Sequence, residues 1–151
     1  DSTDGWVIRL PLELEWQLAA GDDRPGVWYP WGGYDPDPLR ANTEEAGLGR
    51  PIAVGMYPHG ASPAGVLDMC GNVWEWGLMQ YDMWHPPRHV RYGGSFRTPA
   101  RRAAIFARSG QRPDVAEAGV GFRLVYGPAL DRVPSPWPAG ISRTVLSSRP
   151  A

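Results

Sequence analysis

The sequence contains no lysine, so arginine supplies all 15 of its basic residues. A GC-rich genome, growth at high temperature, or selection for planar, forked cations would each account for this, and codon bias is the simplest explanation. Sixteen acidic residues bring the formal net charge to −1. This balance predicts no general affinity for nucleic acid or for anionic membranes.

Cysteine and long apolar runs are also scarce. Cys70 is the single cysteine, which excludes an internal disulfide framework. No apolar run approaches the roughly 20 residues that a membrane-spanning helix requires, so we expect no membrane insertion. The chain shows no signal peptide and no initiating methionine, which is consistent with a fragment of a longer protein. Nothing in the sequence indicates a cellular compartment.

What the sequence has in abundance is glycine (19), proline (17) and tryptophan (8) in 151 residues. So much glycine and proline approaches the composition of disordered chains, but disordered chains are poor in aromatic residues. We therefore predict one ordered domain over residues 1–127, in which loops outweigh regular structure. The proline-rich residues 128–151 are predicted to form a tail.

Few stretches favour regular structure. Leu12 to Ala20 predicts a helix, because Pro11 suits a first helical turn and Gly21 suits a helix end. The remaining residues are predicted to form loops between a few short strands. The predicted strands cover residues 52–55, 73–76, 89–92 with a continuation through 95–96, and 120–126.

The stretch from Gly71 to Trp76 combines a turn with a strand. Gly71 and Asn72 tolerate positive φ and suit a tight turn. Trp74 and Trp76 then share one face of the strand, where we expect them to form a core. Glu75 points to the other face and needs a partner, such as Arg108 or Arg123.

These motifs, in this order, resemble the formylglycine-generating-enzyme (sulfatase-modifying-factor) family. The resemblance implies an α+β, C-type-lectin-like fold with small antiparallel sheets, short helices and much loop. Only eight residues precede Arg9, where the family has further strands and a helix, so the chain is expected to be the C-terminal part of such a domain. The remainder would lie on another segment or on a partner chain. The matching residues are Arg9-Leu10-Pro11, Glu13, Glu15-Trp16, Ala19-Ala20, Tyr29-Pro30-Trp31-Gly32, Ala41-Asn42, Val54-Gly55, Pro58, Gly65, Asp68-Met69, Gly71 to Trp76, Gly93-Gly94-Ser95-Phe96, Ala107-Arg108-Ser109, Pro113-Asp114 and Gly121-Phe122-Arg123.

The chemistry of the catalytic relatives is not matched. The family's copper enzymes use a pair of cysteine thiolates after the Gly-Gly-Ser-aromatic motif, and residues 96–107 contain no cysteine here. His59, His85 and His89 lack the spacing of an iron site. We therefore predict a protein without catalytic residues or cofactor. The family sometimes builds a calcium site at this motif, which makes Asn72 and Glu75 a weak candidate, although an arginine partner for Glu75 is preferred.

Variable proteins of diversity-generating retroelements belong to the same superfamily, and in them the segment after the Gly-Gly-Ser-aromatic motif carries a hypervariable ligand-binding surface. The resemblance thus implies a display surface at residues 97–119, with an ordinary arginine-rich loop as the alternative. The predicted ligand-contacting residues are Tyr81, Trp84, Arg97, Thr98, Ala100, Arg101, Ala107, Ser109, Gln111, Val115, Glu117, Ala118 and Gly119.

Three classes of function remain open. The first is a non-catalytic module that binds a protein or another macromolecule other than nucleic acid, because aromatic residues and arginine dominate interface energetics. The second is an oxidoreductase of the formylglycine-generating type. The third is a structural domain of a larger assembly.

Overall fold

The computed structural model describes residues 5–21, 26–82 and 86–130. Contacts divide the chain into two units. The larger unit runs from Arg9 to Val125, and the smaller one combines Asp1–Ile8 with Tyr126–Ala151. Most of the predicted tail, residues 131–151, lies outside the described residues.

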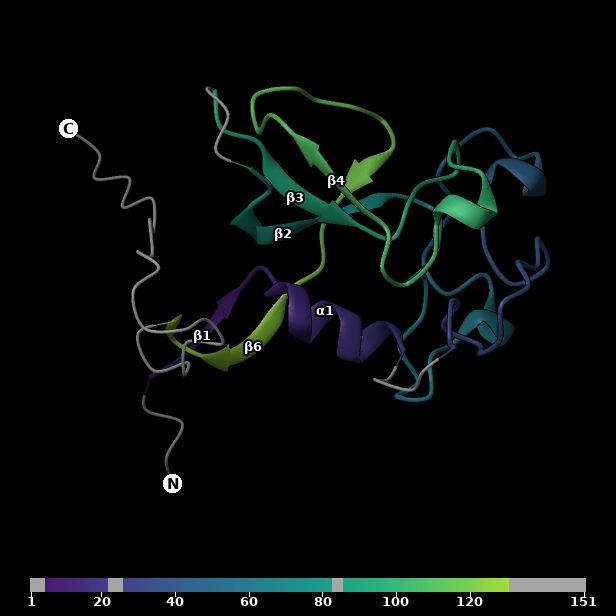
Figure 1. Cartoon of the computed structure of the whole chain (residues 1–151), viewed down its shortest axis with the longest axis horizontal. Coiled ribbons are helices and arrows are strands. Elements are labelled where there is room, and N and C mark those ends of the chain that lie inside the picture. The colour runs from purple at the N-terminus through teal and green to yellow at the C-terminus, as the bar shows by residue number, and fades with distance from the viewer. Residues whose placement is uncertain (1–4, 22–25, 83–85, 131–151) are drawn as a thin grey trace. The chain divides into compact units, whose positions relative to one another are not determined.

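Most of the described residues of the smaller unit lie in a two-stranded sheet. It pairs β1 (Trp6–Arg9) with β6 (Val125–Pro128), as Figure 1 shows. The rings of Trp6 and Tyr126 lie 5.2 Å apart, and the Ala129 N–H donates to the Gly5 carbonyl at 2.7 Å. The sequence did not predict β1.

The helix α1 (Glu13–Ala20) confirms the predicted helix. Arg9 and the Leu12 N–H both bind the Glu15 carboxylate, which fixes the first turn. Trp16 and Ala20, one turn apart, are buried, and Gly21 ends the helix. In the ranges that the structure describes, no helix has the length and apolar character needed to cross a bilayer.

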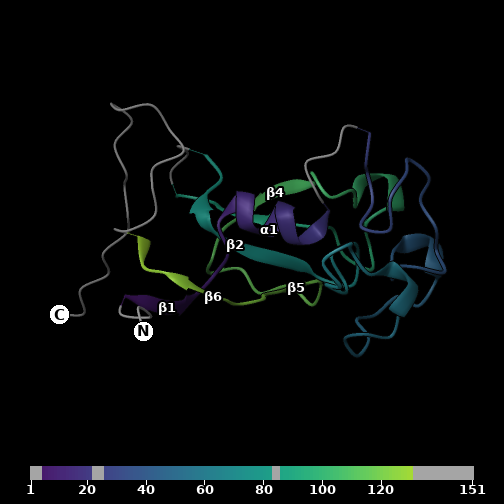
Figure 2. The same ribbon diagram turned by 90° about the horizontal axis from the view of Figure 1, so that it is seen from below.

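The main sheet has four strands in the order β4-β3-β2-β5. Strand β2 (Trp74–Gln80) pairs antiparallel with β3 (His89–Tyr92), and β3 pairs antiparallel with β4 (Arg108–Gln111). The short β5 (Val120–Gly121) runs parallel to β2 along its other edge. Helix α1 contacts β2, and Figure 2 shows it running alongside that strand. The molecule is therefore α+β, as predicted, with small sheets and much loop.

Several strand boundaries differ from the prediction. The predicted strand 120–126 divides into β5 and the start of β6, because Arg123 turns inward to an ion pair while Phe122 and Leu124 are exposed. Residues 78–80 extend β2 instead of beginning a loop. Strand β4 was missed because its sequence, Arg-Ser-Gly-Gln, lacks apolar alternation.

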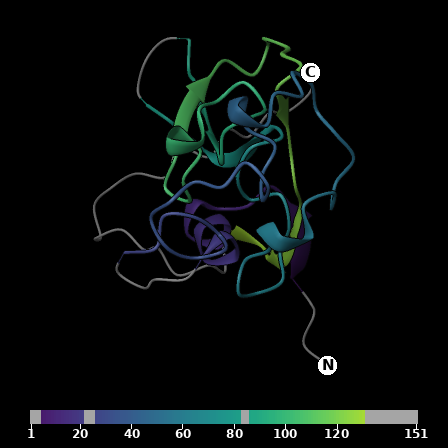
Figure 3. The same cartoon turned by 90° about the vertical axis from the view of Figure 1, so that its right-hand side faces the viewer.

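Two other strand predictions are wrong, namely the strand at residues 52–55 and the continuation of the strand 89–92 through residues 95–96. Residues 52–55 form no strand; Val54 is exposed and Gly55 has φ of 80°. Residues 95–96 enter a turn, in which the Phe96 N–H donates to the Asn72 carbonyl at 3.0 Å. The only helical turns between residues 26 and 73 are η1 (Glu44–Ala46) and η2 (Pro58–Gly60). Figure 3 shows the loops that contain these turns, coloured blue, facing the viewer.

The predicted tryptophan core is also wrong. Trp74 and Trp76 are only partly buried, and the covered face of β2 carries Glu75 and Gly77. Gly77 is required there because an added Cβ would lie 2.4 Å from the Tyr92 ring. Two clusters form the core: one contains Trp16, Ala20, Met69, Val90, Tyr92 and Ile105, and the other contains Tyr29, Ala41, Cys70 and Ala103.

Candidate ligand-binding face

The turn at Gly71-Asn72 connects the loops to the main sheet. Both residues have positive φ, 76° and 59°, as predicted. The Asn72 N–H donates to the Asn42 carbonyl at 2.7 Å. A Cβ on Gly71 would lie 2.4 Å from that same carbonyl oxygen, so only glycine fits.

The Asn72 side chain holds a neighbouring loop. Its Oδ1 accepts hydrogen bonds from Asn42 Nδ2 at 3.2 Å and from the Ile52 N–H at 3.0 Å. Its Nδ2 donates to the Ile52 carbonyl at 3.3 Å. These bonds attach residues 42 and 52 to the turn that precedes β2.

Glu75 is a buried carboxylate of the larger unit. Arg123 binds it through Nε at 2.6 Å and Nη2 at 2.7 Å, and Trp16 Nε1 donates to it at 2.7 Å. The predicted pairing with Arg123 is confirmed, whereas Arg108 pairs with Glu13 at 2.9 Å. Protein donors therefore already bind the oxygens of Asn72 and Glu75 that a calcium ion would use, and calcium stays a prediction.

The cysteine chemistry does not fit a copper centre of two thiolates. Cys70, the single cysteine, is 3% exposed within the second core cluster. Burial, with a smaller contribution from Glu45, raises the pKa of the Cys70 thiol to about 12, so it stays protonated at neutral pH. Among the residues that the structure describes, no three histidine, cysteine, aspartate or glutamate side chains gather as metal ligands.

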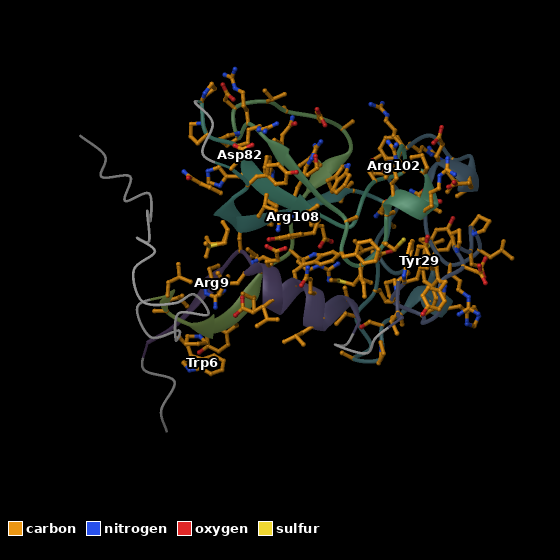
Figure 4. The ribbon with its side chains drawn as sticks, viewed as in Figure 1. Trp6, Arg9, Tyr29, Asp82, Arg102 and Arg108 are labelled. Atoms are coloured by element: carbon orange, nitrogen blue, oxygen red, sulfur yellow. The ribbon has the colours of Figure 1, made fainter. Side chains whose placement is uncertain are left out.

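The segment after the Gly-Gly-Ser-Phe motif lines an open hollow of about 580 Å³. Figure 4 labels Arg102 at the short helix η3 (Ala100–Arg102) and Arg108 at the start of β4, two of the elements that form it. We call this the arginine hollow. It is lined by Trp74, Arg97, Thr98, Pro99, Arg101, Arg102, Ala104, Phe106, Ala107, Arg108 and Ser109.

Hydrogen bonds from other loops and within the segment itself fix the backbone of the arginine hollow. The Ala100 N–H donates to both Glu45 carboxylate oxygens at 3.0 and 2.9 Å, and the Ala100 carbonyl accepts from the Tyr29 hydroxyl at 3.1 Å. The Thr98 hydroxyl accepts from the Ser95 N–H at 3.0 Å. The exposed arginines that follow thus project from a backbone held at several points.

A second segment, residues 111–118, lies next to β4. Glu117 binds Arg91 at 3.0 Å and Gln111 Nε2 at 3.0 Å. The hydrogen bond from Arg91 holds the pKa of Glu117 below its usual value. Arg91 also lies over the Trp74 ring, 5.1 Å from its centroid. Arg91 therefore links the loop through Glu117 to Trp74, which lines the arginine hollow.

The comparisons with known proteins agree with this geometry. The profile of the sulfatase-modifying factor enzyme 1-like domain matches residues 3–127. The chain belongs to this family. It is 34% identical over 133 residues to the inactive C-alpha-formylglycine-generating enzyme 2 of Bos taurus, covering 79% of this chain and 44% of that protein. It is 42% identical over 94 residues to the hercynine oxygenase of Mycobacterium tuberculosis strain H37Rv, covering 58% of this chain and 22% of that protein.

Among solved structures, variable protein 1 of Treponema denticola superposes with a TM-score of 0.64 and 25% identity, over 80% of this chain and 48% of that one. This likeness supports the C-type-lectin-like fold that the sequence motifs imply. The bovine and mycobacterial relatives found by sequence include one that is named as inactive and one that is named as an enzyme. The chain spans less than half the length of these relatives.

The predicted site residues of this sulfatase-modifying-factor-like chain do not lie in one place, and their contact with a ligand stays a prediction. Those in the arginine hollow are Arg97, Thr98, Arg101, Ala107 and Ser109, with Thr98 itself buried. Those on the adjoining loop are Gln111, Val115, Glu117 and Ala118, mostly exposed. Ala100 and Gly119 are buried and serve the backbone, Tyr81 packs beside the core under Arg108, and Trp84 lies outside the described residues.

Several residues that line the arginine hollow were not among the predicted ligand-contacting residues. Trp74 was assigned to the core because of its alternation with Trp76. Arg102 and Phe106 lie inside the predicted segment, and the run of arginines at 101–102 was a signal that could have included Arg102. Arg108 was predicted as a family motif residue and as a possible partner for Glu75, but not as a ligand contact.

Proposed function

We propose that this chain is a non-catalytic binding module, whose binding face combines the arginine hollow with residues 111–118. The single observation that supports this most is the arrangement of exposed arginine and aromatic side chains on a backbone held by internal hydrogen bonds. A rigid, preorganised surface loses little conformational entropy on binding. Arginine and aromatic residues are also the types that contribute most to protein interfaces.

The single cysteine of this chain favours a binding function over copper-dependent oxidation. Copper-dependent oxidation in the family needs two thiolates, and this chain has one buried, protonated thiol. The likeness to a bovine relative named as inactive agrees with this proposal. The alternative, an oxidoreductase of the formylglycine-generating type, is favoured by the relatives that are named as enzymes.

A turnover assay separates binding from oxidation. The chain would be incubated with copper(I), oxygen and a peptide bearing a sulfatase-type cysteine motif, and the products analysed by mass spectrometry. We expect no conversion of cysteine to formylglycine and no stoichiometric copper in an anaerobic titration. Repeated turnover by the chain would disprove the proposal.

A peptide-display selection tests the binding face directly. Peptides selected on the chain would be measured again against S109E/V115E/A118E, which alters the face, and against L39E/V54E, which alters exposed loop positions outside the arginine hollow. We expect the first variant to weaken binding at least about tenfold, because a loss of about 1.4 kcal/mol of binding free energy raises the Kd by that factor. Equal binding to both variants would show that the face is not the binding surface.

The structural likeness to a protein named as variable favours a more specific form of this proposal. In that form, residues 97–119 are the hypervariable segment of a retroelement-diversified protein. The gene would then lie near a reverse transcriptase gene and a near-copy of the segment encoding Gly93 to Arg123, differing only at adenines. Without that near-copy, the chain would be an unspecialised binding domain.

A further inference from the structure

The arginine hollow collects most of the unpaired positive charge in the described part of the chain. Arg97, Arg101 and Arg102 are exposed and make no side-chain hydrogen bond or ion pair in the residues described. Arg50 is the one other described arginine without a carboxylate partner. The remaining arginines form the pairs Arg9–Glu15, Arg40–Asp37, Arg88–Asp82, Arg91–Glu117, Arg108–Glu13, Arg112–Asp114 and Arg123–Glu75.

Two carboxylates act on these arginines, but each is occupied elsewhere. Glu45 feels the charge of Arg101, yet its oxygens accept the Ala100 N–H and the Thr43 hydroxyl. Glu117 feels the charge of Arg97, yet it is bound by Arg91 and Gln111. Among the described residues, the hollow therefore keeps three guanidinium groups that no carboxylate binds directly, on a protein whose formal net charge is −1.

Apolar side chains stand beside these guanidinium groups. Phe106 is 50% exposed and is held by the edge of Trp28, with ring centroids 5.2 Å apart. Trp74, on β2, is held beneath Arg91. A ligand in the hollow would thus meet forked hydrogen-bond donors and aromatic surface together.

We propose that the arginine hollow binds an acidic peptide segment of a partner protein. Aspartate or glutamate carboxylates pair with Arg97, Arg101 and Arg102, because the planar guanidinium fork matches a carboxylate. Apolar side chains of the same peptide pack on Trp74 and Phe106. This inference rests on the binding function proposed above and specifies the chemistry of its ligand.

A peptide is favoured over nucleic acid by the extent of the charge. Three of the four unpaired arginines in the described ranges line one open hollow, whereas nucleic-acid binding neutralises a row of phosphates. A peptide supplies carboxylates and apolar groups within a few residues. The arrangement therefore suits a short acidic and hydrophobic segment.

The test uses a fluorescein-labelled peptide of alternating glutamate and leucine, and its glutamine counterpart, in fluorescence anisotropy titrations. We expect the glutamate peptide to bind at low salt and the glutamine peptide to bind at least tenfold more weakly. R101Q/R102Q should weaken binding of the glutamate peptide at least tenfold. R50Q removes one exposed and unpaired arginine outside the hollow, and this control should change binding less than twofold. Circular dichroism would verify that each variant is folded.

Several results would overturn the inference. They are failure of the glutamate peptide to bind, an equal loss with R50Q, or tighter binding of heparin or of a single-stranded oligonucleotide at the same arginines. Peptides that are selected on the face but bind R101Q/R102Q unchanged would also overturn it, while leaving the proposed binding function intact. Turnover in the oxidation assay, in contrast, would disprove the proposed function itself.

Discussion

At the scale of single residues, the buried side chain of the Trp74–Trp76 stretch is Glu75, whereas the two tryptophans are only partly buried. The sequence predicted that Glu75 needs an arginine partner, and the structure confirms Arg123. It did not predict that Trp16 Nε1, 59 positions away, donates to the same carboxylate. One carboxylate thereby connects α1, β2 and the segment that follows β5.

The first prediction concerns this carboxylate. Glu75→Ala leaves the Arg123 guanidinium and the Trp16 indole N–H without their acceptor, and removal of one partner of a buried pair costs about 3 kcal/mol. Urea unfolding would measure the loss. The control is Glu117→Ala, whose side chain is 45% exposed and whose pair with Arg91 should contribute under about 1 kcal/mol. Similar losses for the two variants would contradict the structural role of Glu75.

The second prediction concerns Cys70. Its raised pKa and its burial should make the native thiol react with iodoacetamide at pH 8 at least about 1000-fold more slowly than the thiol of the unfolded chain. Mass spectrometry with and without urea gives the two rates. Comparable rates would show an accessible thiolate and would weaken the argument against thiol chemistry.

At the scale of secondary-structure elements, predictability followed local sequence patterns. α1 and β3 were predicted closely, because Pro11 and Gly21 bound the helix and His89–Tyr92 is a compact strand sequence. β4 depends on pairing with β3 instead of its own composition, and β1 depends on pairing with β6. Such pairings are tertiary effects that one strand's sequence does not reveal. Residues 97–119 were predicted as a surface from a local motif, whereas the position of Trp74 beside them depends on tertiary packing and was not predicted.

The third prediction concerns the start of α1. The hydrogen bonds from Arg9, chiefly, and from the Leu12 N–H hold the pKa of Glu15 below its usual value. A depressed folded-state pKa contributes stability that is present above the unfolded pKa of about 4.3 and is lost as the pH falls through the lower folded value. Glu15→Gln should therefore destabilise the chain by roughly 1 kcal/mol at pH 6 and by less at pH 3.

Urea midpoints at the two pH values measure this difference. Other ion pairs titrate in both proteins and cancel from the comparison. Glu44→Gln is the control, since the exposed Glu44 side chain makes no hydrogen bond in the described residues, and it should cost little at either pH. A penalty for Glu15→Gln that stays constant or grows toward pH 3 would contradict the assignment.

At the scale of the whole molecule, the larger unit separates a fixed interior from an exchangeable face. The backbone from residue 95 to residue 107 is held by contacts to Glu44, Asn72, Trp28 and Tyr29. The side chains that it projects at positions 101, 102 and 106 are exposed. A surface of this kind can change its chemistry without changing its fold.

The final prediction tests that separation. R101S/R102S/V115S/A118S changes four exposed side chains of the face, and exposed substitutions usually alter stability by less than about 0.5 kcal/mol each. The four together should therefore shift the free energy of unfolding by no more than about 2 kcal/mol. In contrast, the single substitution Ala103→Leu overfills a fully buried site against Gly94 and should cost about 1–3 kcal/mol. Urea unfolding of both variants measures the contrast. If the four surface changes unfolded the chain while Ala103→Leu were tolerated, the face would be part of the core, and neither a variable surface nor a peptide-binding hollow could be built on it.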